Sequence, residues 1–224
     1  MWRLLSSFPV SKVKFTVISC ERSLNAISPF IELQKALPDV FDEGVCVSPD
    51  AITARLQRLN QFIDDVLQNK LSHKYENMVD YNIATPNRAE AMNVLAIFDY
   101  PKGFDAHKNE LLGNIIRNGR KCGVFTIICH NADLQYSRYD TLDEHIAMMK
   151  KNGIATLFKA NNLYLQPYGL ELDFSQRPSA DEASAYTAEY AAAYAQLQRK
   201  GLDFKEIVDP RPFGRDSALS LIHI

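Results

Sequence analysis

The segment from residue 92 to residue 131 constrains the fold more than any other part of the chain. An uninterrupted apolar run at 94–98 ends in an acid, Asp99, and a loop containing proline and glycine follows it. A helical pattern over 105–118 and a second apolar run at 123–128 come next. Strands that are apolar throughout are typical of parallel sheets covered on both faces. Strand, helix and strand together predict a right-handed crossover unit in an α/β fold.

Asp99 is the first candidate for a binding residue because it stands where a predicted strand ends. In open α/β sheets, ligands and metals bind beyond the carboxyl ends of the strands, where loops form a crevice. The residues alone leave a second interpretation open, in which Asp99 is a turn residue that caps the following loop.

The composition limits the class of protein. The chain has 224 residues, of which 46% are hydrophobic and 23% charged, so it can bury one core and is neither disordered nor fibrous. No apolar stretch approaches the roughly 20 residues of a membrane helix, and the weakly basic start does not suit a signal peptide, so we expect a cytoplasmic protein. The four cysteines form no Cys-x-x-Cys pair and predict neither a disulfide nor a metal site. The net charge of −2 neither favours nor excludes nucleic acid.

A long helix is marked from residue 48 onward. Ser48 is a typical N-cap, Pro49 suits the first helical position, and Asp50 places an acid in the first turn. Apolar residues at 52, 56, 59, 63 and 66 form one stripe that continues toward residue 75. We expect this stripe to pack against the core, in preference to forming an arm that binds a partner.

The remaining elements give weaker signals. Residues 12–18 suit a strand, and 154–158 with 162–166 suit a hairpin. Capping boxes that begin at Thr141 and Ser179 each predict the start of a helix. Three tyrosines follow at four-residue spacing in the second of these helices: Tyr186, Tyr190 and Tyr194. That spacing is more typical of a packed face than of a platform on which bases stack.

Two blocks of sequence resemble an ATPase module of the FtsK/SpoIIIE DNA-translocase family, and in particular large bacterial members with several ATPase repeats. The first block is Val94-Leu-Ala-Ile-Phe-Asp99-Tyr-Pro-Lys-Gly-Phe104, and the second is Asn118-Gly-Arg-Lys-Cys-Gly-Val-Phe-Thr-Ile-Ile128. A weaker pattern similarity extends over most of residues 1–218.

The resemblance implies a RecA-like core of the P-loop NTPase class, with a mainly parallel sheet and a long helix insertion. In that fold Asp99 is the Walker B acid, which accepts hydrogen bonds from water on Mg²⁺ and holds the metal against the phosphates of ATP. The neighbouring strand would end at His130 and Asn131, where related ATPases place a polar sensor near the γ-phosphate. A polar loop residue is the alternative interpretation of Asn131.

Two departures from the family pattern limit what the chain is expected to do. No Gly-x-x-x-x-Gly-Lys-Ser/Thr motif occurs among the nine glycines, so the phosphate-binding loop is absent. We expect a fragment that begins after that loop, lacks its strand and helix, and does not bind ATP tightly alone. Asp99 is followed by Tyr100, where hydrolysing members carry a glutamate that orients water. A phenol, with an unperturbed pKa of about 10, cannot act as that base near neutral pH.

The expected organisation is a partial ATPase domain over 1–208, a linker over 209–218 toward a following repeat, and a sequencing-adapter artefact over 219–224. Neighbouring ATPase repeats or subunits are the expected partners. DNA follows from the resemblance only, because we prefer to explain the basic residues near 117–121 and 150–151 by helix dipoles and not by a track for phosphates. Three functions remain open: part of an ATP-driven DNA-translocase or secretion-type motor, a degenerate non-hydrolysing repeat that acts as scaffold or regulator, or an α/β interaction domain without nucleotide chemistry. Tyr100 favours the second.

Overall fold

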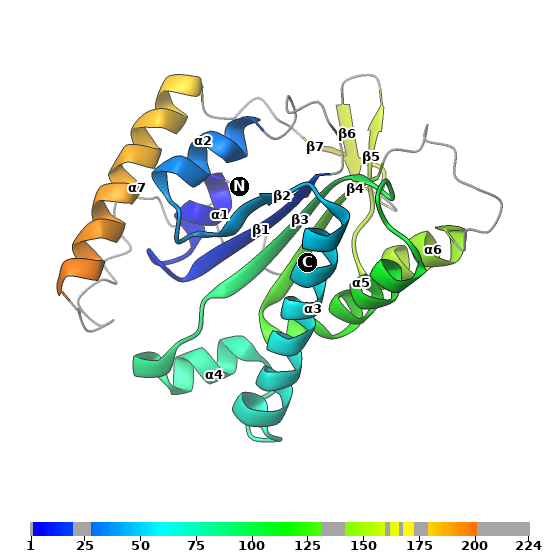
Figure 1. The fold of residues 1–224 in the computed structure, drawn as a ribbon, viewed down its shortest axis with the longest axis horizontal. Coiled ribbons are helices and arrows are strands. Elements are labelled where there is room, and N and C mark those ends of the chain that lie inside the picture. The colour runs from blue at the N-terminus through cyan, green and yellow to red at the C-terminus, as the bar shows by residue number, and fades with distance from the viewer. Residues whose placement is uncertain are drawn as a thin grey trace.

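The chain folds into an α/β structure built around one parallel sheet (Figure 1). The computed structural model describes residues 2–19, 28–130, 142–159, 162–165, 168–172 and 179–200. The predicted linker at 209–218 and the final segment at 219–224 lie outside these ranges. Within the described part of the chain, no helix is both long enough and apolar enough to cross a membrane.

Four strands that run in the same direction form the central sheet, in the order β2-β1-β3-β4. They are β1 (Val13–Ser19), β2 (Phe41–Cys46), β3 (Met92–Tyr100) and β4 (Val124–His130). Three of them confirm predicted apolar runs. The sequence pattern does not predict β2, because two acids and a glycine interrupt its apolar residues. Since all four strands are parallel, their carboxyl ends lie along one edge of the sheet.

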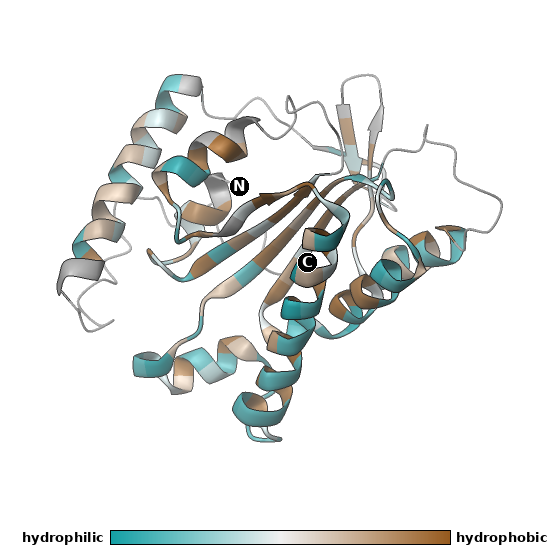
Figure 2. Ribbon diagram, viewed as in Figure 1, coloured by the Kyte–Doolittle hydropathy of each residue, from teal (hydrophilic) through white to brown (hydrophobic). Residues whose placement is uncertain are grey.

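Helices cover both faces of the sheet. Consecutive residues of a strand point to opposite faces, and the strands are apolar on both. Ile18 and Leu95 belong to one buried cluster, which includes α3 (Pro49–Asp65) and α5 (Ala106–Asn118). Val17 and Val94 belong to the other, which includes α1 (Trp2–Ser7), α2 (Ser28–Ala36) and α7 (Ala180–Lys200). Figure 2 shows the largely apolar strands of the sheet between these helices, and polar residues alternate with apolar ones along α3 and α5.

The long helix predicted from Ser48 is confirmed. The Ser48 hydroxyl accepts a hydrogen bond from the amide of Ala51 at 3.3 Å, and a proline stands in the first turn. The helix continues without interruption into a π-helical segment, η1 (Val66–Leu71), which ends at Ser72 in the left-handed conformation. Every residue of the predicted stripe is buried: Ile52, Leu56, Leu59, Ile63 and Val66. The stripe therefore packs in the core, as expected.

A chain of asparagine amides joins α3 to α5. Asn114 of α5 donates to Oδ1 of Asn60 at 2.5 Å, and Asn118 donates to Oδ1 of Asn114 at 2.7 Å. Asn60, which is buried, donates in turn to the main-chain oxygens of Leu56 at 2.8 Å and Leu111 at 3.1 Å. The contact between α3 and α5 thus combines apolar packing with side-chain hydrogen bonds from asparagines.

The crossover from β3 to β4 has defined ends. Asp105 caps α5 by accepting a hydrogen bond from the amide of Lys108 at 2.9 Å, and its carboxylate also pairs with the Lys108 ammonium group. After α5 the chain passes through Gly119 and a short 3-10 turn, η3 (Arg120–Cys122), into β4. The predicted strand–helix–strand unit is therefore confirmed, with both strands parallel and adjacent.

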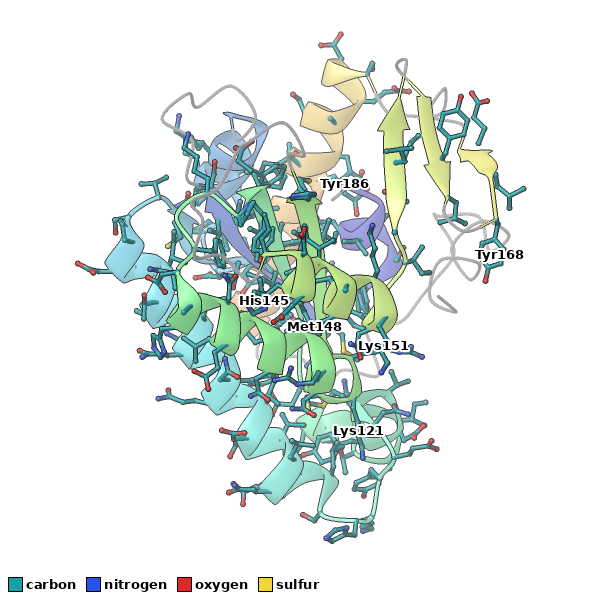
Figure 3. The ribbon with its side chains drawn as sticks, turned by 90° about the vertical axis from the view of Figure 1, so that its right-hand side faces the viewer. Lys121, His145, Met148, Lys151, Tyr168 and Tyr186 are labelled. Atoms are coloured by element: carbon teal, nitrogen blue, oxygen red, sulfur yellow. The ribbon has the colours of Figure 1, made fainter. Side chains whose placement is uncertain are left out.

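Smaller elements surround this core. Helix α4 (Met78–Ala84) and the 3-10 turn η2 (Pro86–Arg88) lead into β3, and α6 (Leu142–Asn152) follows β4. Figure 3 shows α6 in front of α5, and Met148 of α6 lies close to Gly113 of α5. Thr141, the predicted cap of α6, lies outside the described residues.

The predicted hairpin is confirmed, and a third strand extends it into a small antiparallel sheet. Its strands are β5 (Thr156–Lys159), β6 (Asn162–Leu165) and β7 (Leu170–Leu172). The capping box at Ser179 is confirmed too, because Ser179 and Glu182 exchange hydrogen bonds of 2.8 and 3.3 Å between main chain and side chain. Tyr190 of α7 is buried against the sheet, so the tyrosine spacing marks a packed face as predicted.

The edge of the sheet at β4 is open among the described residues, since β4 pairs with β3 only. Phe125 is 37% exposed and Ile127 is 49% exposed, although both belong to a run that the sequence predicts as a strand. Their side chains share one face, two residues apart. The second strand of the crossover is therefore less covered than the first.

Candidate functional site at the carboxyl edge of the sheet

Asp99 lies at the carboxyl edge of the sheet, as predicted, on a distortion of β3. Ile97 pairs with Ile128 and Tyr100 pairs with His130, so β3 has one residue more than β4 between these two pairs. Such an extra residue is a β-bulge, which re-aims the side chains beside it. Asp99 also has a φ of +56°, in the left-handed region that L residues other than Asn and Asp adopt at a cost of roughly 1–2 kcal/mol.

The Asp99 carboxylate has an oxygen without a protein partner. Its Oδ2 atom is buried and makes no hydrogen bond. The turn after β3 is closed by the main chain, because the amide of Lys102 donates to the carbonyl oxygen of Asp99 at 2.9 Å. This geometry does not favour the interpretation of Asp99 as a turn cap. A buried carboxylate oxygen without a partner costs about 1–3 kcal/mol or more, so the fold holds this atom in an unfavourable state.

Ser19 is a second polar residue at this edge, and sequence reasoning missed it. It is the last residue of β1, it is fully buried, and its hydroxyl oxygen makes no hydrogen bond. Ser19 pairs with Phe98, the residue before Asp99. The signal was present in the sequence, because Ser19 ends an apolar run just as Asp99 does. A buried hydroxyl without a partner also costs about 1–3 kcal/mol.

Tyr100 does not face the site. The bulge turns its side chain into the core, where it is fully buried and lies edge-on to Phe104 with ring centroids 5.2 Å apart. Its hydroxyl donates to Oδ1 of Asn109 on α5 at 2.9 Å. Position 100 therefore belongs to the core in this chain. A side chain at this position would have to leave the core to reach a ligand at the edge of the sheet.

The end of β4 adds Cys129 and His130. Desolvation raises the pKa of the Cys129 thiol, and the negative charge of Asp99 raises it further. Desolvation lowers the pKa of His130, and the positive charge of Lys150 adds to this effect, so the imidazole is neutral near pH 7. Asn131, the predicted sensor residue, lies outside the described residues.

The influence of Asp99 on Cys129 gives a direct test of this geometry. Replacing Asp99 with asparagine, which also tolerates positive φ, removes the charge that disfavours the thiolate. The pKa of Cys129 should then fall, and its reaction with a disulfide reagent at a fixed pH should become several-fold faster. The measurement uses a Cys20→Ser background, and Cys46 and Cys122 are buried. Equal rates with and without the Asp99 charge would show that the two side chains are not neighbours.

A divalent cation fits this edge only with help from other ligands. Among the described residues no group of three or more His, Cys, Asp or Glu side chains could hold a metal ion. Mg²⁺, however, is usually bound by one or two carboxylates together with water and the phosphates of a nucleotide. The unpaired Asp99 oxygen fits that arrangement, since it can accept a hydrogen bond from water on such an ion. The chain has no phosphate-binding motif to hold the rest of the nucleotide.

The sequence matches no protein-family model and no curated protein. Solved structures do share its fold. ATPases 2 and 3 of EssC from Geobacillus thermodenitrificans align with a TM-score of 0.57 at 10% identity, over 89% of this chain and 41% of that one. The cytoplasmic domain of EssC aligns with a TM-score of 0.54 at 11% identity, over 89% and 42%. The cytoplasmic domain of the Type VII secretion ATPase EccC from Thermomonospora curvata aligns with a TM-score of 0.56 at 11% identity, over 82% and 24%.

These matches show the fold of the chain and the share of each matched protein that it covers. The chain spans about two fifths of the EssC chains and about a quarter of the EccC chain. At this level of identity the likeness concerns the fold alone. The predicted α/β fold is confirmed: the four-stranded parallel sheet matches the RecA-like ATPase domains of EssC and EccC.

Proposed function

We propose that the chain is part of a nucleotide-binding module of the FtsK/SpoIIIE kind that binds Mg²⁺ with ATP, only weakly when the chain is alone, and does not hydrolyse it. It would serve in the cytoplasm as a scaffold or regulator beside neighbouring ATPase repeats. The observation that supports this proposal best is the buried, unpaired Oδ2 of Asp99 at the carboxyl edge of the sheet. The likeness to the secretion ATPase EccC favours a secretion-type motor over a DNA translocase as the setting.

Asp99 and Tyr100 have separate parts in this proposal. The Asp99 carboxylate accepts hydrogen bonds from water on the cation, and the bulge fixes its direction. When bound, the cation supplies charge neutralisation for the phosphates. Tyr100, at the position after the acid, is committed to the core through Asn109 and Phe104. The arrangement therefore favours binding of a nucleotide without its hydrolysis.

Paramagnetic line broadening in NMR spectra of the 224-residue chain tests the metal assignment. Mn²⁺ binds the same oxygen ligands as Mg²⁺, and broadening reports weak complexes. We expect Mn²⁺ with the non-hydrolysable analogue AMPPNP to broaden the amide signals of residues 97–100 and 128–130. The variant Asp99→Asn should lose this broadening at equal concentrations.

Asp64→Asn is the matched control. Asp64 is an exposed acid on α3 that acts electrostatically on Cys122. Cys122 ends η3, just before β4 begins, and thus lies away from the carboxyl edge. The control should keep the broadening of the wild-type chain. If Asp99→Asn is broadened as strongly as wild type, the metal assignment is wrong. If the wild-type chain releases phosphate from ATP and Asp99→Asn does not, the chain hydrolyses ATP and the second half of the proposal is wrong.

A further inference from the structure

We propose that Ser19 is a second contact for the ligand, and that its hydroxyl oxygen accepts a hydrogen bond from water on the same divalent cation that Asp99 holds. This inference rests on the proposed function, because it concerns the same edge of the sheet. It assigns a binding role to a strand, β1, to which neither the sequence patterns nor the similarity in fold gives one.

The first argument is the state of the Ser19 side chain. It is 0% exposed, and its hydroxyl oxygen has no hydrogen-bond partner. Two other buried polar residues, Asn60 and Asn109, do have hydrogen-bond partners within the protein. An alanine at position 19 would fill the same space without a buried polar atom. The Ser19 hydroxyl therefore does not contribute a hydrogen bond to the packing of β1.

The second argument is the position of Ser19 relative to Asp99. The two strands pair in register up to Ser19 and Phe98, and Asp99 follows immediately. Neighbouring strands lie roughly 5 Å apart. Because the bulge places both Ile97 and Tyr100 on the face of α3 and α5, Asp99 is left on the opposite face of the sheet, which it shares with Ser19. Two unpaired oxygens, one on each strand end, suit the waters of a hydrated cation, which donate hydrogen bonds to both. A phosphate oxygen accepts hydrogen bonds and would meet repulsion from the Asp99 carboxylate.

Ser19→Ala separates a binding role from a structural one through two measurements on the 224-residue chain. Titration with Mn²⁺, with and without AMPPNP, is followed by broadening of the amide signals at residues 97–100. We expect the apparent Kd of Ser19→Ala to rise about fivefold, the effect of losing one hydrogen bond of about 1 kcal/mol. Without metal, its midpoint of thermal unfolding should be equal to or higher than that of wild type, because a buried unpaired hydroxyl has been removed.

Thr16→Val is the matched control, since Thr16 is a buried polar residue of the same strand, three positions from the edge. It should leave the apparent Kd for Mn²⁺ unchanged. If Ser19→Ala binds Mn²⁺ as tightly as wild type while Asp99→Asn does not, this inference fails and the proposed function stands. If both variants bind as wild type does, both fail. A lower unfolding midpoint for Ser19→Ala would show that its hydroxyl stabilises the fold, which also overturns the inference.

Discussion

Replacing Tyr100 with glutamate, the residue that the family resemblance leads us to expect after the acid in a hydrolysing member, should strongly destabilise the chain without conferring ATP hydrolysis. Tyr100 is fully buried against Phe104 and bonded to Asn109. Losing a buried aromatic side chain costs about 3–5 kcal/mol, and the carboxylate must also be buried or neutralised. We expect the free energy of unfolding to fall by about 4 kcal/mol or more. Urea denaturation followed by circular dichroism measures the loss.

Tyr100→Phe is the control for this experiment, because it keeps the ring and removes only the hydroxyl. Its cost should be about 1 kcal/mol, the value of one hydrogen bond together with the partner left behind on Asn109. A Tyr100→Glu chain that is as stable as Tyr100→Phe would mean that side chain 100 faces solvent. Phosphate release by that variant would further show that the bulge is absent or reversible.

Gly119→Ala should also cause a large loss of stability, because Gly119 sits at the joint between α5 and β4. Its amide donates to the carbonyl oxygen of Ile115 at 2.7 Å, and its own carbonyl accepts from Val124 at 2.8 Å. An added methyl group would clash with the carbonyl oxygen of Ile115 and would lie 2.9 Å from that of Val124. Both obstacles are main chain, so the joint itself must move. We expect a loss of about 2–3 kcal/mol in the free energy of unfolding.

Gly169→Ala provides the comparison, since Gly169 has a φ of +65° and nothing within 4 Å of an added methyl group. It should lose about 1 kcal/mol, from the backbone conformation alone. The difference between the two variants isolates the clash at the joint. Equal losses from both substitutions would show that α5 and β4 are not held as tightly as the hydrogen bonds indicate.

The sequence predicted most of the central fold because its signals were local and strong. Apolar runs marked β3 and β4, and Ser48 with Pro49 marked the start of α3. The signal for β2 failed because two acids and a glycine hide its apolar residues. The third strand of the small sheet has only three residues, too few for a pattern to show.

The same reasoning predicted only part of the candidate site. The end of an apolar run identified Asp99, and the same rule would have identified Ser19, although a serine after a strand more often begins a turn. The bulge could not be predicted, because one extra residue in β3 changes the pairing with β4 and leaves the apolar pattern intact. The burial of Tyr100 follows from the bulge and was therefore equally hidden. Asn131 lies outside the described residues and stays a prediction.

The asparagine amides between α3 and α5 fix the position of α5 along α3, and with it the position of the loop that joins Asp99 to α5. Apolar faces alone would allow α5 to slide along α3 by one turn, about 5.4 Å, with little change in buried area. Such a slip would break the hydrogen bonds that Asn60 makes with Asn114 and Leu111. The start of α5 at Asp105 is thereby locked in one longitudinal position. The six residues from Asp99 to Phe104 then have a fixed anchor at their far end, so the loop beside Asp99 is held in one position.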